Sequence, residues 1–314
     1  ACSFTTAGNF KECDHDADCG SSAVCASTYC LPLPEGCTRA TVSNADHSPY
    51  EQANRVPLVA LLPLHDGDVA DDSEQAGLNA IALAISQVNN LDGIGLQRRF
   101  GLYVCDTQRS DAVLQTQLEW MVHNLETPAV FTSGSGQTKK AAYDPARVDA
   151  GTLIMSATST AAALNSAFIT TGNVWRVAPD DTQQARVIFE RYIKSDFPSA
   201  RLPDGGLVSV AIAYESGSYG DGFEAPVERL LRDAGYGALP LGFEATDPNL
   251  NGVPIKLPVL LPQATVVVAL PTNVSRLVTT TASSLGISGP ALAWFPTHKW
   301  YLADAAKDPV ISQG

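Results

Sequence analysis

The feature that most constrains the fold is a repeated alternation of short apolar runs with segments of helical periodicity. The first run, Val56–Leu62, is continuously apolar and of strand length, as expected for a strand buried on both faces of a sheet. A helix is predicted at 76–88, and Asp71 followed by Glu74 three residues later fits an N-cap with a capping box. Strands that alternate with helices predict βαβ units and a parallel sheet covered by helices on both faces.

The alternation continues along the chain and gives more strands than one sheet normally holds, so we expect an α/β fold with two Rossmann-like lobes. Further strands are predicted at 100–105, 129–132, 152–156, 174–177, 207–214, 239–244, 265–270 and 291–295. Further helices are predicted at 110–124, 137–150, 182–195, 219–235 and 273–285. The segment 254–262 contains three prolines, which limit it to a short helix or an irregular turn.

The predicted domain organisation follows from these elements and from the composition before them. We expect a small cysteine-rich module at 1–37, a polar linker at 38–55, lobe one at 56–176, lobe two at 177–296, and a return toward lobe one at 297–314.

Cysteines are concentrated at the start of the chain, which predicts a disulfide-stapled module in an oxidising compartment. Structural zinc sites usually show close C-x2-4-C pairs, but the shortest spacing here is Cys25-x4-Cys30, with no second matching pair, so disulfides are favoured over zinc. The cysteines before residue 38 are Cys2, Cys13, Cys19, Cys25, Cys30 and Cys37.

The seventh cysteine, Cys105, stands alone, so the total is odd. A small residue followed by Cys2 resembles the cleavage point of a bacterial lipoprotein, which makes Cys2 a candidate lipid anchor. Six cysteines then remain for three bridges, and one bridge must join Cys105 to the module. Cys37 is the simplest partner, because it is the last cysteine before the linker and Cys105 ends a strand beside the first strand.

Charge and motifs exclude several functions. The formal net charge is -13 and no basic cluster exceeds the pair Lys139-Lys140, which argues against nucleic-acid partners and against electrostatic docking on membranes. The sequence has no P-loop, G-x-G-x-x-G, G-x-S-x-G or H-E-x-x-H pattern, and no histidine has a second ligand at metal spacing. We therefore expect no enzyme, cofactor or metal site. Asp14, Asp16 and Asp18 fail the calcium-loop pattern and are interpreted as a solvated acidic turn.

Small polar residues follow the predicted strands at three places. Ser133 and Ser135 flank a glycine after one strand, 156–160 follows the next, and 214–222 follows the first strand of the second half. Ligands of open α/β sheets bind outside the carboxyl ends of strands, where helix N-termini also attract anions. For each loop alone, helix capping is the favoured explanation. Three such loops at corresponding places favour a ligand site.

From Val56 to about His298 the sequence resembles the type I periplasmic binding proteins of the branched-chain amino-acid class. The resemblance is carried by the order and spacing of Val56–Leu62, 102–106, 133–137, 153–159 and 213–222. It implies two lobes that close over a small ligand. It also implies an extracytoplasmic location, periplasmic or extracellular, and a membrane permease of an ABC transporter as partner.

The resemblance also implies roles for individual residues. Ser133 would bind a ligand carboxylate with nearby N–H groups, and the Ala157 carbonyl with the Thr158 or Ser159 hydroxyl would hold the carboxylate and ammonium. Tyr214 and Tyr219 would close from lobe two, the loop 65–72 would face the ligand side chain, and Glu244 or Asp247 would pair with the ammonium. The implied ligand-binding set is Ser133, Ser135, Ala157, Thr158, Ser159, Tyr214, Tyr219 and Glu244.

Two functions therefore remain open at this level. The first is capture of a small polar solute, an amino acid or related carboxylate, for transport. The second is a ligand-sensing or protein-interaction receptor domain with an altered or degenerate pocket, which the cysteine module and the proline-rich segment both favour. Because family members usually continue with strands and helices that return to lobe one, we expect the sequence ending at Gly314 to be part of a longer chain.

Overall fold

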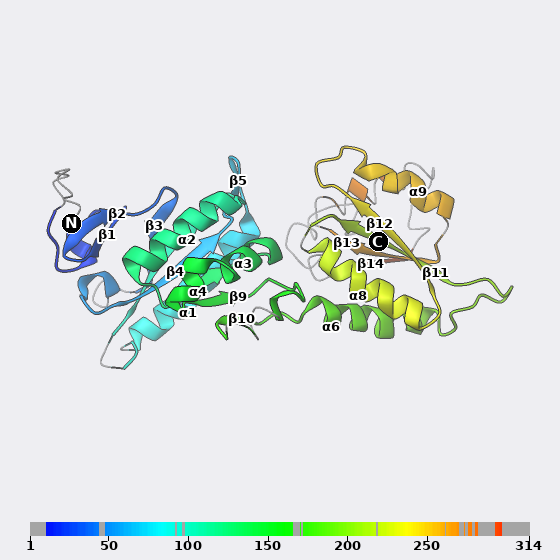
Figure 1. Cartoon of the computed structure of the whole chain (residues 1–314), viewed down its shortest axis with the longest axis horizontal. Helices are drawn as coiled ribbons and strands as arrows, with labels where there is room; N and C mark the ends of the chain where they lie inside the picture. The colour runs from blue at the N-terminus through cyan, green and yellow to red at the C-terminus, as the bar shows by residue number, and fades with distance from the viewer. Residues whose placement is uncertain are drawn as a thin grey trace. The chain divides into compact units, whose positions relative to one another are not determined.

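The computed structural model describes residues 11–43, 48–91, 93–95, 98–165, 170, 172–217, 219–260, 262–269, 273, 276–277, 280–281 and 293–296. The chain divides into two compact units, the first formed by Ala1–Thr158 with Ser166–Val177 and the second by Ser159–Asn165 with Ala178–Gly314. Each unit contains its own sheet (Figure 1). In the described part of the chain, no helix is long and apolar enough to cross a membrane.

The first unit is built on a six-stranded sheet with the strand order β10-β9-β8-β4-β7-β3. The central strand is β4 (Val56–Leu62), which pairs in parallel with both of its neighbours, and only β3 is antiparallel. The parallel sheet predicted from the apolar runs is therefore confirmed. The other strands are β3 (Cys37–Arg39), β7 (Phe100–Asp106), β8 (Ala129–Thr132), β9 (Leu153–Ser156) and β10 (Val174–Arg176).

Helices of the first unit begin at side-chain caps close to the predicted positions. In α1 (Asp72–Asn90) the Asp71 carboxylate accepts the N–H groups of Ser73 and Glu74, as expected of the N-cap, and Ile85 packs against Leu58 on the sheet. One predicted helix is wrong: 137–150 is two helices, because Asp144 caps a new helix that starts at Pro145. The remaining helices are α2 (Asp111–Leu125), α3 (Ser135–Ala142) and α4 (Pro145–Ala150).

The N-terminal module (residues 11–36) consists of η1 (Asp16–Asp18) and the hairpin of β1 (Ala23–Ala26) and β2 (Tyr29–Pro32), drawn in blue in Figure 1. Its two disulfides confirm that the clustered cysteines are oxidised. The third disulfide joins β3 to β7, as predicted from the odd cysteine, with a Cα–Cα distance of 4.0 Å. The pairs are Cys13–Cys25, Cys19–Cys30 and Cys37–Cys105.

The interpretation of Asp16 as part of a solvated acidic turn is wrong. Its carboxylate is fully buried, lies 2.7 Å from the Arg55 guanidinium and accepts the Tyr103 hydroxyl from β7. The Cys25 N–H donates to it as well, at 2.8 Å. Burial raises the pKa of the Tyr103 phenol above its ordinary value, so the hydroxyl keeps the proton it donates. The segment 38–55, expected to be a linker, supplies β3, η3 (Pro49–Glu51) and Arg55 to this packing.

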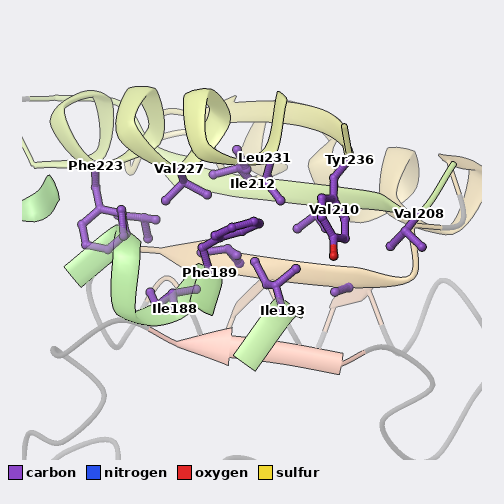
Figure 2. Packing of buried hydrophobic residues seen from close by; sticks show 14 residues of the cluster. Ile188, Phe189, Ile193, Val208, Val210, Ile212, Phe223, Val227, Leu231 and Tyr236 are labelled. Atoms are coloured by element: carbon purple, nitrogen blue, oxygen red, sulfur yellow. The ribbon is translucent and has the colours of Figure 1, made fainter. Parts of the chain in front are cut away.

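The second unit has a four-stranded parallel sheet with the order β12-β11-β13-β14. One of its apolar clusters fills the space between α8 and the sheet, where Phe223, Val227 and Leu231 from α8 meet Ile212 from β11 (Figure 2). The strands are β11 (Ser209–Glu215), β12 (Gly237–Phe243), β13 (Ala264–Val268) and β14 (Ala293–Pro296).

Helices of the second unit depart from the prediction at one place, because the helix expected at 182–195 contains a π-helical segment. The proline-rich segment forms a short helix from Val253 to Leu260, the first of the two forms predicted for it. The helices are α6 (Asp181–Ile188), the π segment η4 (Phe189–Ile193), α7 (Lys194–Asp196), α8 (Gly220–Asp233), η5 (Leu250–Gly252) and α9 (Val253–Leu260). Cys2, most of the helix expected at 273–285, and the segment 297–314 lie outside the described residues.

Candidate ligand-binding site

The carboxyl ends of β8 and β9 carry a small hydroxyl cluster. Ser133 follows β8 directly, Thr158 lies two residues beyond β9, and the two strands are parallel neighbours. The two hydroxyl oxygens are 3.0 Å apart. The Ser133 Oγ donates to Oε1 of Glu74, from the first turn of α1, at 2.5 Å. We call Glu74, Ser133, Gly134 and Thr158 the strand-end cluster.

The hydrogen bonds of the strand-end cluster run in one direction. The Gly134 N–H donates to Thr158 Oγ1 at 3.0 Å, and the Ser133 hydroxyl donates its hydrogen bond to Glu74. A hydroxyl has one proton to donate, so between Thr158 and Ser133 the Thr158 hydroxyl must be the donor. The hydrogen bonds therefore form a continuous chain from the Gly134 N–H through Thr158 and Ser133 to the Glu74 carboxylate.

A second polar layer lies beneath the cluster and fixes its backbone. Thr138 on α3 is 3.0 Å from the Thr132 hydroxyl at the end of β8 and donates to Ser156 Oγ on β9 at 3.3 Å. All three side chains are buried. Gly134, the N-cap of α3, has φ 68°, a conformation that a side chain would strain. Ser135, the first residue of α3, is also buried.

A separate group of charged residues lies at the ends of β4 and β7. The Asp106 carboxylate accepts the N–H groups of Leu64 at 3.0 Å and Gln108 at 2.9 Å, and lies 2.7 Å from His65 Nδ1. Because a carboxylate only accepts, Nδ1 of His65 carries the proton in this contact. His65 belongs to the exposed hairpin of β5 (His65–Asp66) and β6 (Val69–Ala70), within the loop that we expect to face a ligand.

Asp71 in the same loop has a structural role. It caps α1 and forms an ion pair with Arg109, which follows β7. Asp68 and Asp72 are exposed. The acidic character of the loop is therefore partly a capping requirement, as the predicted N-cap at Asp71 indicated.

The two tyrosines predicted for lobe two pack within the second unit. The Tyr214 ring covers Gly242 on β12, so that a Cβ at Gly242 would lie 2.9 Å from it. Burial, with the nearby Glu224 and Asp221 carboxylates, raises the pKa of the Tyr214 phenol. The Tyr219 ring packs edge-on against Phe223, with 6.2 Å between ring centroids.

The other predicted residues are more dispersed. Ser159 is fully buried and belongs to the second unit, whereas Ala157 is exposed in the first. The Glu244 side chain is exposed, and its N–H donates to Asn251 Oδ1 at 2.7 Å. Asp247 accepts the N–H groups of Asn249 and Asn251, which lowers the pKa of its carboxyl. Among the predicted residues of the first unit, the structure thus brings Ser133 and Thr158 together.

Glu74 is the residue of this cluster that sequence reasoning missed. Its place three residues after Asp71 was explained locally, as half of a capping box. A signal was available, however, because α1 follows β4 and β8 is the parallel neighbour of β4. The first turn of α1 and the end of β8 therefore had to lie at one edge of the sheet.

Among the described residues, one group has three potential metal-ligand atoms close together. The sulfur atoms of Cys13, Cys19 and Cys30 lie within 4.8 Å of one another. All three sulfurs belong to disulfides, so they offer no thiolate to a metal ion.

Comparison with known proteins identifies solved structures with a similar fold. No family model and no curated protein matches the sequence. Three similar solved structures are an ABC transporter substrate-binding protein from Desulfitobacterium hafniense (18% identity, TM-score 0.59, covering 79% of this chain and 67% of that one), LivJ from Streptococcus pneumoniae in complex with isoleucine (16%, 0.61, 77% and 64%), and the leucine-binding protein LivK from Thermotoga maritima (14%, 0.60, 74% and 61%).

These neighbours are substrate-binding proteins of ABC transporters, LivJ among them for branched-chain amino acids. The chain thus has the type I periplasmic binding protein fold, as the sequence predicted, with a disulfide module added at its N-terminal side. It spans about two thirds or less of the length of these structures. The compared proteins are binding proteins rather than enzymes.

Proposed function

We propose that this protein is an extracytoplasmic solute-binding protein that captures a small polar ligand, an amino acid or a close relative, for the permease of an ABC transporter. The observation that carries the proposal is the strand-end cluster, which places Ser133, Thr158 and Glu74 outside the carboxyl ends of parallel strands. Ligands of open α/β sheets bind at this kind of position. The fold of the neighbours supports the same role.

Three disulfides support an oxidising, extracytoplasmic compartment. We propose lobes at 56–176 and 177–296 as the two halves of the clamp, and Cys2 as a lipid attachment site. The proposed contacts from the first unit are Ser133, Ser135, Ala157 and Thr158, and those from the second are Ser159, Tyr214, Tyr219 and Glu244.

A ligand screen tests the proposal. The disulfide-intact protein is heated with each of the amino acids in turn, and the unfolding temperature is recorded. A ligand at a hundred times its Kd stabilises the folded state by about 2.7 kcal/mol, a clear thermal shift. Stabilisation by a few related compounds, followed by calorimetric titration with a stoichiometry near one, is the expected result. A flat response across the panel and its amine and acid analogues would contradict solute capture.

A second candidate function is a protein-interaction domain on the same fold. It is favoured by α9, where Ile255 and Val259, one helical turn apart, are exposed by 66% and 77%. Exposed apolar patches often mark protein contacts. A flat ligand screen together with concentration-dependent association that Val259→Ser abolishes would support this function instead.

A further inference from the structure

We propose that the N-terminal module is a redox-controlled zinc site. In the oxidised protein its four cysteines form two disulfides and offer no thiolate to a metal ion. After both disulfides are reduced, the same four sulfur atoms bind one Zn²⁺ ion as a tetrahedral thiolate site. This site is separate from the strand-end cluster and does not depend on solute binding. Its four ligands are Cys13, Cys19, Cys25 and Cys30.

The sulfur atoms of the two disulfides already lie close together, although the spacing of the cysteines along the sequence is unusual for zinc. The sulfurs of Cys13, Cys19 and Cys30 are within 4.8 Å of one another. Four sulfurs at about 2.3 Å from one zinc ion in a tetrahedron are roughly 3.8 Å apart. The fourth sulfur belongs to Cys25, which is bonded to Cys13 and lies opposite Cys30 in the β1–β2 hairpin. Small rotations of the side chains therefore suffice to place four sulfurs around one ion.

Backbone hydrogen bonds hold the first and the last cysteine of the group independently of the disulfides. The Cys13 N–H donates to the Thr28 carbonyl at 3.0 Å. The Cys30 N–H donates to the Lys11 carbonyl at 2.8 Å. Both hydrogen bonds join residues 11–13 to the hairpin of β1 and β2, so these two thiols stay near each other when the disulfides are broken.

The buried Asp16 holds the other two cysteines in the same way. Its carboxylate accepts the Cys25 N–H at 2.8 Å, and its backbone carbonyl accepts the Cys19 N–H at 3.0 Å. The Asp16 carboxylate is in turn paired with Arg55 at 2.7 Å. These contacts involve no sulfur atom. We therefore expect the reduced module to keep its four thiols gathered at one place.

Burial and charge also suit a metal ion. Cys13 and Cys19 are exposed by only 7% and 6%, so their sulfurs are largely shielded from water. A zinc ion with four thiolate ligands has a net negative charge. The Arg39 guanidinium donates to the carbonyls of Cys19 and Gly20 at 3.1 and 3.0 Å, which places a cation beside the site to compensate that charge.

A dithiol is the class of reductant that this exchange requires. Each disulfide takes two electrons and two protons from one dithiol, which is itself oxidised to a disulfide. Two dithiols therefore yield four thiols in the module, and binding of one Zn²⁺ ion to them as thiolates releases four protons. The reverse exchange, with oxidised dithiols, restores both disulfides and releases the ion.

The test compares the oxidised full chain with the same chain reduced by a phosphine in the absence of oxygen. The phosphine ends as its oxide, with the oxygen of water, and the excess is removed before zinc is added. Bound zinc is measured by equilibrium dialysis, and cobalt is added in a parallel sample, because thiolate-to-cobalt charge-transfer bands report sulfur ligands. One tightly bound zinc ion per reduced chain, none on the oxidised chain, and a tetrahedral four-thiolate cobalt spectrum are the expected result.

Two variants locate the ion, both measured after full reduction. Cys19→Ser removes one of the four ligands and keeps nearly the same shape, so zinc affinity should fall roughly a hundredfold or more. Cys37→Ser/Cys105→Ser is the matched control, because it removes two cysteines that lie outside the group. The zinc affinity of this control should stay within about twofold of the parent.

Several outcomes would overturn the zinc site. They are a reduced parent that binds no zinc, an oxidised chain that binds it as tightly, a Cys19→Ser variant with the parent's affinity, and a control that loses as much affinity as Cys19→Ser. If Cys19→Ser fails to fold, the cobalt spectrum of the parent still decides, because four thiolates give a stronger charge-transfer band than two. Solute binding is measured on the oxidised chain, so its success or failure leaves this result unaffected.

Discussion

Both units are α/β structures, but different kinds of interaction stabilise the interior of each unit. The first unit contains all three disulfides, a buried ion pair between Asp16 and Arg55, and the polar strand-end cluster. The second unit has no cysteine in its sequence, and its described core is formed by apolar clusters around Phe223 and Phe243 (Figure 2). Its strand-end tyrosines pack against that core rather than standing apart from it.

The difference indicates where specificity is built. A polar cluster with fixed donor directions can recognise a ligand without rearrangement, provided that the backbone around it is rigid. In the proposed function, the disulfides and the Asp16–Arg55 ion pair would supply that rigidity to the first unit, and the second unit would contribute mainly apolar contact. Four predictions test this division of roles.

The largest expected effect comes from Arg55→Met. This change leaves the Asp16 carboxylate buried without its cation, and breaking a buried pair in this way costs about 3–5 kcal/mol. The loss should be confined to the first unit. Hydrogen exchange of peptides from β7, compared with peptides from β11, measures it for each unit.

The matched control is a surface ion pair of the second unit. Arg232 and Glu228 are 2.6 Å apart on α8, with 60% of the Arg232 side chain exposed. Arg232→Met should change the unfolding free energy by less than about 1 kcal/mol. Similar losses in both variants would show that the Asp16–Arg55 pair is no more important than an exposed one.

The next largest loss of stability is expected for the double variant Cys37→Ala/Cys105→Ala. The disulfide closes a loop with a sequence separation of 68 residues, and removing a native disulfide typically costs about 2–5 kcal/mol. We expect β3 to separate from β7 and the module to exchange amide hydrogens faster. Hydrogen exchange that is unchanged at β3 and β7 would mean that the Asp16 network alone holds the module.

Ser133→Ala is expected to have a moderate effect on ligand binding. It removes the hydrogen bond that Ser133 donates to the Glu74 carboxylate, a bond to a charged group worth about 1.5–3 kcal/mol, so affinity should fall roughly ten- to a hundredfold. Ser216→Ala, at the exposed serine that follows β11 in the second unit, is the control and should leave affinity unchanged. A larger loss for Ser216→Ala would reverse the proposed division of roles between the units.

The smallest effect concerns the pH dependence of the second unit. The N–H groups of Asn249 and Asn251 lower the pKa of Asp247 below its usual value of 3.8. The ionised carboxylate therefore stabilises the fold above the unfolded-state pKa, and this stability is lost as pH falls through the lower folded pKa. Asp247→Asn should weaken the acid dependence of hydrogen exchange around η5. A variant with the parent's pH profile would rule out this contribution.

The sequence predicted the strands well because their signal is local. β4 begins and ends where its apolar run does, since a strand buried on both faces is apolar throughout, and β8 has the predicted bounds. The break between α3 and α4 was missed although Asp144-Pro145 is a local start signal. The helical periodicity runs through this break, so it hides the cap at Asp144.

The site was less predictable because its contacts are distant in sequence. Glu74 and Ser133 are 59 residues apart, and Asp16 and Tyr103 are 87 apart. Each residue taken alone has an adequate local explanation, as a capping residue or an acidic turn. Only the position of the first turn of α1 at the end of β8, and the packing of the module against β7, give them their partners.

The central claim is that the strand-end cluster of the first unit is part of a ligand-binding site. The most direct measurement is a crystal structure of the protein with the amino acid that binds most tightly in the screen. The account predicts a polar group of the ligand within hydrogen-bond distance of Ser133 or Thr158. A bound ligand that contacts neither side chain would contradict it.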